Sequence, residues 1–320
     1  MDQETGYNIT WSCTVKIPPF WSRMQAAIME PTPLEQRPYA RLDPRRVRRA
    51  LGRAAHNPAE EMFGFIDRQL LERITEIRFA PERILEVARI PGECARLLQT
   101  QHPKARVITM GLVAPTRSLT SAWRLPWQRR PLVLQADPRR FPLPENHFDL
   151  AVCNMMLHWS SEPLITLREI RRVLKPGAPL LLATMGDASL TELKESLARI
   201  DQTRHGRTWI RVPEFHSLHD LGDLLASAGF SLPVVDRDLA RPVLADVPDL
   251  LQRLRIMGAT NAHRQRPAGL MGKGYPRQLA QIYTTLYGAR DGSIPVTLEI
   301  LFGHAWKKGA GHGVPSNSHR

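Results

Sequence analysis

Three strand-like segments of this chain end near positions that can bind a nucleotide. Glu86 lies within the apolar run 84–87, Gly111 follows the run 106–110, and Asp137 follows the run 132–135. In an open α/β sheet, the carboxyl ends of the parallel strands form the edge where ligands bind. In nucleotide-binding sheets, an acidic side chain at this edge accepts hydrogen bonds from a ribose. These positions therefore predict a nucleotide-binding edge.

The same region lacks a carboxylate at the end of its second strand. Glu93 and Asp137 bracket residues 94–136, a stretch of 43 residues with no Asp or Glu and with seven Arg or Lys. Gly111 stands where an acid would accept hydrogen bonds from both ribose hydroxyls, and this stretch offers no substitute. Such hydrogen bonds contribute about 1.5–3 kcal/mol each. Losing two of them weakens nucleotide binding by roughly two to four decades.

The elements that position these residues alternate between strands and helices, which predicts a doubly wound, mostly parallel α/β sheet. The predicted strands cover residues 84–87, 106–110, 132–135, 148–153, 179–184, 232–235 and 296–306. Apolar residues at helical spacing predict helices within 42–77 and over 95–98, 164–174, 190–200, 218–228, 247–257 and 276–287.

The chain divides into a globular body and two flanking segments. Residues 1–40 contain prolines without periodicity and are predicted to form a loose extension, whereas residues 309–320 are predicted to be a disordered tail. The body, residues 41–308, begins with helices and carries a predicted lid or helical insertion at 186–216 and 247–290. The polar, basic connection 201–216 is the part expected to act as the lid.

Charge and composition describe a globular chain with a basic surface. The net charge is +13, and 42% of the residues are hydrophobic. This excess suits an acidic partner, whether nucleic acid, an anionic membrane or an acidic carrier protein, although a generally solvated basic surface is an equally simple interpretation. Apart from the cluster 45–49 the arginines are scattered, and no zinc-finger, RNA-binding or basic-zipper pattern favours nucleic acid or predicts a metal site.

The cysteines and the hydropathy pattern predict a cytoplasmic protein. Cys13, Cys94 and Cys153 are far apart and belong to no motif, as expected in a reducing compartment. No apolar run reaches the roughly 20 residues that cross a bilayer, and the N-terminus does not follow the order of a secretory signal.

Residues 137–177 carry the most specific pattern. Asp137 follows a strand, residues 143–149 read LPENHFD before the next strand, and residues 169–177 read EIRRVLKPG. In these features the chain resembles class I S-adenosylmethionine (SAM) dependent methyltransferases, over roughly residues 42–308. The resemblance implies a Rossmann-like sheet of seven strands whose last strand is antiparallel.

A narrower resemblance rests on short segments elsewhere. These read LDPRRV at 42–47, SLTELK at 189–194, HDL at 219–221, GF at 229–230, LRIMGA at 254–259 and GHAWK at 303–307. Together they resemble the malonyl-[acyl-carrier protein] O-methyltransferases of biotin synthesis. The layout is also similar to a mitochondrial complex I assembly factor of this fold, so the resemblance alone does not fix one reaction.

The resemblance implies SAM as the cofactor and identifies its binding positions as Glu86, Ala88, Gly92, Gly111, Asp137 and Asn154. Glu86 and Gly92 match the family's acidic, glycine-rich turn. Ala88 and Ile90 stand where glycines are expected, and each adds a Cβ to a turn that is expected to need positive φ. Arg89 adds a large, positively charged side chain to the same turn.

Asp137 has two interpretations. By the resemblance it contacts the adenine amine of SAM. On its residues alone it is equally a turn-forming Asp before Pro138.

The acceptor side carries fewer signals. His158, at the end of the fourth predicted strand, either orients a substrate or acts as a base, or simply packs beside Trp159. Arg204 and Arg207 are candidates for holding a carboxylate, although each also fits a solvated loop. Methyl transfer to a carboxylate needs alignment rather than a general base, so no catalytic residue is predicted.

Two functional hypotheses follow. In the first, the chain moves a methyl group from SAM to the free carboxyl of a malonyl group on an acidic acyl carrier protein, with impaired cofactor binding. In the second, it is a catalytically inactive methyltransferase fold that serves as a binding or assembly module.

Overall fold

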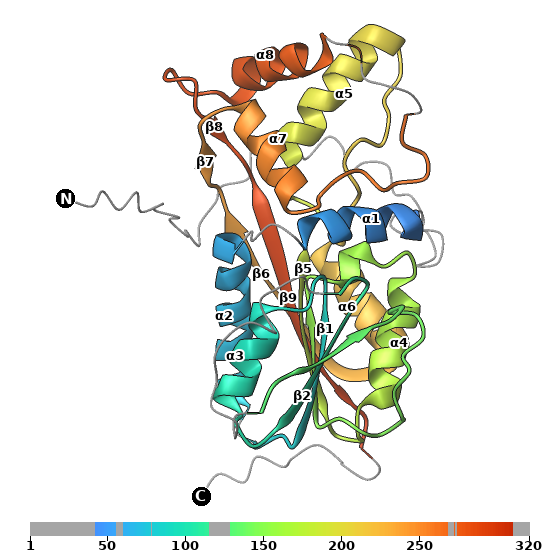
Figure 1. The fold of residues 1–320 in the computed structure, drawn as a ribbon. Helices are drawn as coiled ribbons and strands as arrows, with labels where there is room; N and C mark the ends of the chain where they lie inside the picture. The colour runs from blue at the N-terminus through green and yellow to red at the C-terminus, as the bar shows by residue number, and fades with distance from the viewer. Residues whose placement is uncertain are drawn as a thin grey trace, which may run out of the picture.

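The computed structural model describes residues 42–55, 60–77, 79–114, 129–267, 272 and 274–309. The predicted N-terminal extension and nearly all of the predicted tail lie outside these residues. At the centre is a seven-stranded sheet of order β3-β2-β1-β4-β5-β9-β6 (Figure 1). Its strands are β1 (Arg83–Ala88), β2 (Arg106–Gly111), β3 (Leu132–Gln135), β4 (Leu150–Asn154), β5 (Pro179–Met185), β6 (Phe230–Ala240) and β9 (Leu298–Lys307).

The sheet confirms the predicted fold class. Strands β3, β2, β1, β4 and β5 are parallel, and β9 is antiparallel to both β5 and β6. Every residue of β5 is buried, as expected for an apolar run covered on both faces. The sequence missed a small two-stranded sheet of β7 (Val243–Leu244) and β8 (Ile294–Pro295), because two-residue strands carry no periodicity.

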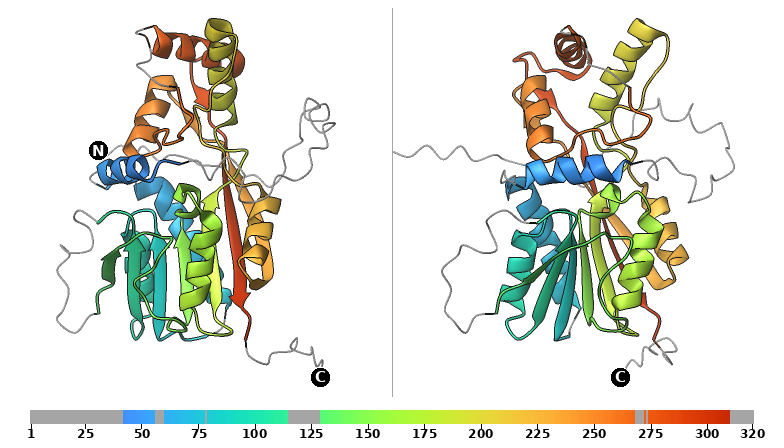
Figure 2. Two further views of the ribbon diagram at one scale, coloured as in Figure 1. Left: turned by 90° about the vertical axis from the view of Figure 1, so that its right-hand side faces the viewer. Right: turned by 45° about the vertical axis from the view of Figure 1, so that its right-hand side comes forward.

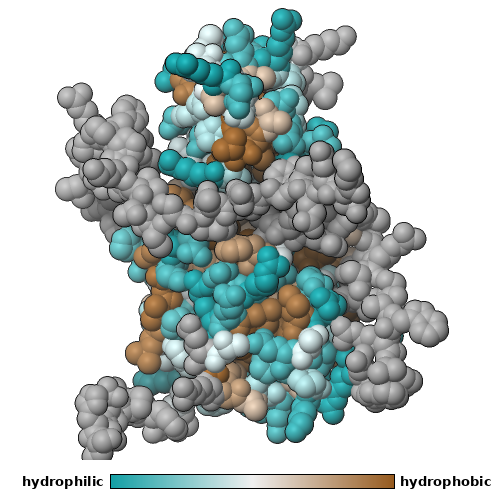
Figure 3. All heavy atoms as spheres, turned by 90° about the vertical axis from the view of Figure 1, so that its left-hand side faces the viewer, coloured by the Kyte–Doolittle hydropathy of each residue, from teal (hydrophilic) through white to brown (hydrophobic). Residues whose placement is uncertain are grey.

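Helices cover both faces of the sheet, with α2 (Glu60–Glu76) and α3 (Glu93–Gln101) on one side (Figure 1). On the other side lie α4 (Pro163–Val173) and α6 (Leu218–Ser227). Figure 3 views the α2 side, where the described surface is largely hydrophilic with separate hydrophobic patches. No helix among the described residues is long and apolar enough to cross a membrane.

A helical cap stands beyond the carboxyl ends of the parallel strands (Figures 1 and 2). It consists of α5 (Thr191–His205), α7 (Val247–Ile256) and α8 (Tyr275–Tyr287), which share their own apolar cluster. The helix predicted over 190–200 continues to His205, so the first five residues of the predicted 201–216 connection are helical. Gly206, at φ +63°, ends it in the left-handed conformation.

Helix α1 (Pro44–Ala54) lies between the cap and the sheet (Figure 2). Asp43 caps it by accepting hydrogen bonds from the backbone N–H groups of Arg45 and Arg46. The backbone N–H of Asp43 donates to the carbonyl of Ala262 at 2.9 Å. The N-terminal helix is thereby fixed to the loop that follows α7.

Candidate functional site

The sheet register brings the predicted cofactor positions to one edge. Ala88 pairs with Asn154 across β1 and β4, Glu86 pairs with Thr109 across β1 and β2, and Gly111 pairs with Gln135 across β2 and β3. Because these strands are parallel, their carboxyl ends meet under the cap. The structure therefore places Glu86, Ala88, Gly111 and Asn154 together.

Glu86 is buried, with the Thr109 hydroxyl donating to its Oε2 at 2.5 Å. Burial raises the pKa of this carboxyl to about 7, against the opposing effect of the Thr109 hydrogen bond. A second buried acid, Asp67 on α2, accepts a hydrogen bond from Asn154 Nδ2 at 2.6 Å, and burial raises its pKa to about 6. The sequence analysis missed Asp67, although an acid between Ile66 and Leu70 on an apolar helix face is a usable signal.

Arg89 connects the end of β1 to two other elements. Its Nη1 donates to the carbonyl of Met257 at 2.9 Å, and its Cζ lies 4.0 Å from the centroid of the Phe63 ring. Burial lowers the pKa of its guanidinium to about 10, partly offset by the charge of Asp67. Arg89 thus holds the β1–α3 loop against both α2 and the C-terminal end of α7.

Pro91 fills the space beside Gly111. A Cβ added to Gly111 would lie 2.7 Å from Pro91 Cδ and 3.1 Å from the carbonyl oxygen of Ala88. Any side chain at 111 would therefore require the β1–α3 loop to move. The place where the family resemblance expects a ribose-binding acid is closed by the chain itself, which the sequence alone did not predict.

The loop does not have the backbone conformation expected from the family pattern. Ala88 and Ile90 are not among the described residues with positive φ, and Gly92 is extended, at φ −175°. The expectation that a Cβ at positions 88 and 90 would strain a left-handed turn is therefore wrong for this loop. Its backbone adopts φ angles that any residue can adopt, and the Ile90 side chain packs against the core.

Asp137 lies in a groove of about 410 Å³ beside α1, but its carboxylate is already engaged. Arg139 donates to it from Nε at 2.9 Å, from Nη2 at 2.7 Å and from its backbone N–H at 3.0 Å. These hydrogen bonds hold the pKa of Asp137 below its usual value. Arg139 Nη1 also contacts Glu162 at 2.7 Å. The geometry matches the turn-forming interpretation, and a ligand in the groove must compete with Arg139 for this acid.

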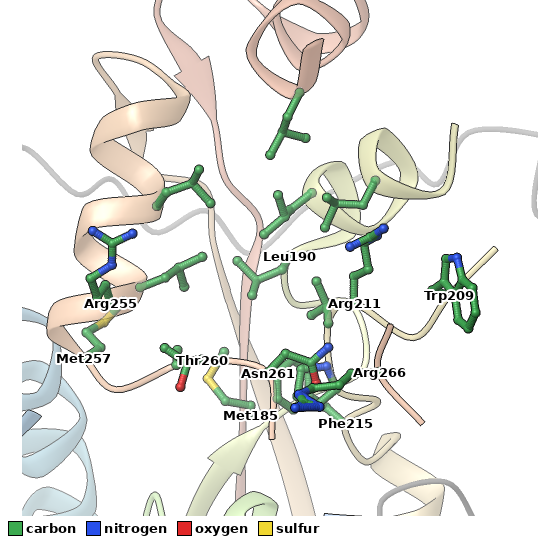
Figure 4. Close-up of a pocket in the computed structure, with 18 of the residues that line it drawn as sticks. Met185, Leu190, Trp209, Arg211, Phe215, Arg255, Met257, Thr260, Asn261 and Arg266 are labelled. Atoms are coloured by element: carbon green, nitrogen blue, oxygen red, sulfur yellow. The ribbon is translucent and has the colours of Figure 1, made fainter. Parts of the chain in front are cut away.

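A second cavity, of about 650 Å³, lies between the sheet edge and the cap (Figure 4). Its walls are mainly apolar side chains from β5, α5, α7, α8 and the loops between them, including Met185, Leu190, Leu193, Leu254 and Leu279. His158 lines it from the 3-10 helix η4 (Leu157–Trp159) that follows β4. The cavity has the size and apolar lining of a small-molecule site.

The arginine side chains near this cavity differ in whether an ion pair or a hydrogen bond already holds them. Arg211 is tied to the fully buried Asp201, with Nη2 2.7 Å from Oδ1, and Arg204 donates to Gln278 Oε1 at 2.6 Å. Arg207 is exposed, stacks on Trp209 and does not line the cavity. Arg266 is half-buried in the lining, and among the described residues no ion pair or hydrogen bond engages its guanidinium. No sequence pattern pointed to Arg266, because it lies in a loop.

His158 has an uncharged imidazole in this structure. Its Nδ1 lies 3.1 Å from Thr184 Oγ1, and its ring packs against Trp159 and Phe215. Burial lowers its pKa to about 3, with smaller effects of the same sign from His216 and Arg89. A neutral imidazole can hydrogen-bond an acceptor substrate but cannot neutralise a carboxylate.

Comparison with known proteins gives a consistent picture. Residues 85–182 match the family described as "Methyltransferase domain". The chain is 33% identical over 273 residues to a malonyl-[acyl-carrier protein] O-methyltransferase of Gallionella capsiferriformans, covering 83% of this chain and 91% of that protein. It is 34% identical to the protein of the same name from Halorhodospira halophila, covering 78% and 81%. The YcgJ protein of Bacillus subtilis has the same fold, with a TM-score of 0.50 at 15% identity, covering 75% of this chain and 98% of YcgJ.

SAM is the cofactor of such methyltransferases, and the site fits it only in part. Glu86 and Asn154 lie on neighbouring strands at the carboxyl edge of the sheet, and Asp137 lines a groove beside α1. The ribose side does not fit, because Pro91 occupies the position of the missing acid. At the end of β2, where the resemblance expects a ribose-binding carboxylate, Gly111 and Ala88 therefore offer only backbone groups.

Proposed function

Because the chain belongs to the malonyl-[acyl-carrier protein] O-methyltransferase family, we propose that it methylates the free carboxyl of a malonyl group carried by an acidic acyl carrier protein. The single observation that carries this proposal is the apolar cavity of about 650 Å³ under the cap, with a half-buried guanidinium in its lining. Its mainly apolar walls suit the thioester arm, while a cation suits the carboxylate. Biotin precursor synthesis in the cytoplasm is the setting we propose, and the buried, unpaired Cys94 and Cys153 fit a reducing compartment.

SAM, when bound, supplies the electrophilic methyl group. The residues of this chain then have two tasks, to align the acceptor carboxylate and to keep water away. No general base is needed, because a carboxylate is already the nucleophile. The apolar side chains of the cavity suit the second task, and His158, packed against Trp159 and Phe215, forms part of the same wall.

We propose Arg266 as the residue that holds the malonyl carboxylate. Figure 4 shows Arg211, Arg255 and Arg266 among the side chains of the cavity, and of these Arg255, on α7, is exposed whereas Arg266 is half-buried. Arg211 is neutralised by Asp201, and Arg89 is committed to Met257 and Phe63. A guanidinium without a carboxylate partner can bind a substrate carboxylate in bidentate geometry. Arg204, an exposed residue in the lining of the cavity, remains a second candidate.

The proposal is tested by incubating the purified protein with SAM and malonyl-[acyl-carrier protein]. The expected product carries one added methyl group on the malonyl carboxyl, detected by mass spectrometry. Acetyl-[acyl-carrier protein], which lacks a free carboxyl, is the matched control and stays unmodified. Rescue of a biotin-requiring strain that lacks its own methyltransferase is the corresponding test in cells. Absence of both product and rescue would reject the enzyme.

A second candidate function is a binding or assembly module that does not catalyse methyl transfer. The contact of Pro91 with the Gly111 position favours it, because the ribose subsite is closed and Arg89 fixes the closing loop. Isothermal titration with SAM separates the two functions. Micromolar affinity supports the enzyme, whereas no heat at millimolar SAM supports the module.

A further inference from the structure

We infer that the exposed face of α1 is the surface on which the acidic carrier protein docks. This inference rests on the proposed function and adds to it the surface on which the carrier protein binds. Helix α1 has eleven residues, of which Val47, Ala50, Leu51 and Ala54 are buried. Its exposed residues include the five arginines 45, 46, 48, 49 and 53.

The positive charge of this face is largely unneutralised. Of these five arginines, only Arg46 has an ion-pair partner among the described residues, Asp43, at 3.5 Å. Arg45, Arg49 and Arg53 follow one another at four-residue spacing, which places like charges side by side on a helix and destabilises it. A partner rich in carboxylates would relieve this repulsion, and charge complementarity of this kind accelerates and orients docking.

Helix α1 is also a firm platform. Gly258, at φ +76°, lets the chain after α7 approach so closely that an added Cβ would lie 2.9 Å from Ala54 Cβ and 3.0 Å from Ala50 O. The bond from Asp43 N–H to Ala262 fixes the other end of the helix. The arginines are therefore presented by an element held at both ends.

The position of α1 links this surface to the cavity. Helix α1 lies across the carboxyl edge of the sheet, between the cap and the core (Figures 1 and 2). Leu42, just before it, lines both the groove beside α1 and the apolar cavity, as does Trp159. These two buried side chains form the wall that the groove and the cavity share, so a carrier docked on α1 would lie beside the cavity.

A carrier protein fits these features better than nucleic acid does. Both are anionic, and a basic helix alone does not distinguish them. The neighbouring cavity does, because its mainly apolar walls suit an acyl thioester better than a polyanionic backbone. The occupant of α1 is therefore an acidic protein that carries an acyl thioester arm.

The test measures binding of holo-[acyl-carrier protein] without an acyl group, in low salt and without SAM. The variant Arg45→Glu/Arg48→Glu/Arg49→Glu lowers the net charge by six, from +13 to +7. Its matched control is Arg168→Glu/Arg277→Glu/Arg290→Glu, which makes the same change at three exposed positions outside α1. We expect the α1 variant to lose at least about tenfold in affinity and the control to stay within about twofold of the parent.

Several results would overturn the inference. These are no carrier binding by the parent protein, equal losses in both variants, or no loss in the α1 variant. Selective loss of duplex DNA binding with unchanged carrier binding would assign α1 to nucleic acid instead. If the Glu variant does not fold, as judged by circular dichroism, the neutral variant Arg45→Gln/Arg48→Gln/Arg49→Gln decides. Because no SAM is present, this result stands whether or not the protein transfers methyl groups.

Discussion

The two halves of the sheet's carboxyl edge differ in how much of their space is occupied by the protein's own side chains. On the β1–β2–β3 side, Pro91 lies against Gly111, Arg89 fixes the loop, and Asp137 is paired with Arg139. On the β4–β5 side, a cavity of about 650 Å³ is kept open by the cap. The scaffold is intact in both halves. The departure from the family pattern is therefore local to the β1–β2–β3 side, while the β4–β5 side keeps an open cavity.

The largest expected effect concerns the cap that keeps the acceptor cavity open. Asp201 is fully buried and paired with Arg211, so Asp201→Asn leaves a guanidinium without its charge partner. We expect the free energy of unfolding to fall by about 3–5 kcal/mol, measured by urea denaturation. The half-buried pair Asp249–Arg253 is the control, and because it lies closer to water Asp249→Asn is expected to cost at most about 1 kcal/mol. Equal effects would show that the cap does not depend on this buried pair.

The next effect concerns the β1–β2–β3 side and its pH dependence. The pKa of Glu86 is raised by burial, so the folded state holds its proton more tightly than the unfolded state does. Its stabilising contribution is present in full below the unfolded pKa near 4.5 and is lost as pH rises through about 7. We expect Glu86→Gln to reduce the loss of stability between pH 5 and 8 by about 3 kcal/mol, measured by denaturation at each pH. An unchanged pH profile would contradict the buried, protonated carboxyl.

A comparable effect is expected at the β4–β5 side. If Arg266 holds the substrate carboxylate, Arg266→Ala should lower kcat/KM for malonyl-[acyl-carrier protein] by about a hundredfold. Arg266→Lys should recover only part of the lost kcat/KM, because an ammonium group cannot form the paired hydrogen bonds that a guanidinium makes to a carboxylate. The affinity for SAM, measured by titration, should stay unchanged in both. Arg207→Ala, on the exposed loop, is the control and should behave like the parent.

The smallest effect would reopen the β1–β2–β3 side. Gly111→Asp alone is expected to clash with Pro91 and to cost about 1–3 kcal/mol of stability. Pro91→Ala/Gly111→Asp removes part of that clash and provides an acid for the ribose. We expect the double variant to regain stability and to bind SAM at least about tenfold more tightly than the parent, by titration. If the parent already binds SAM at micromolar Kd and the double variant does not improve on it, the ribose subsite is not the weak point.

The sequence by itself determined the fold and the family. Alternating apolar runs and amphipathic helices require a doubly wound sheet, and the motifs along residues 42–308 identify the methyltransferase family, because both depend on local patterns. It also located the missing acid at Gly111 and the altered loop from Ala88 to Gly92.

Only the tertiary structure decided how those positions are used. Pro91 reaches Gly111, Arg89 reaches Phe63 and Met257, and Arg266 joins Met185 and Leu279 around one cavity, all from residues far apart in the chain. No periodicity encodes such contacts, because they arise where loops meet across the sheet edge. Residue types set the chemistry of each group, whereas packing decided which groups stay available to a ligand.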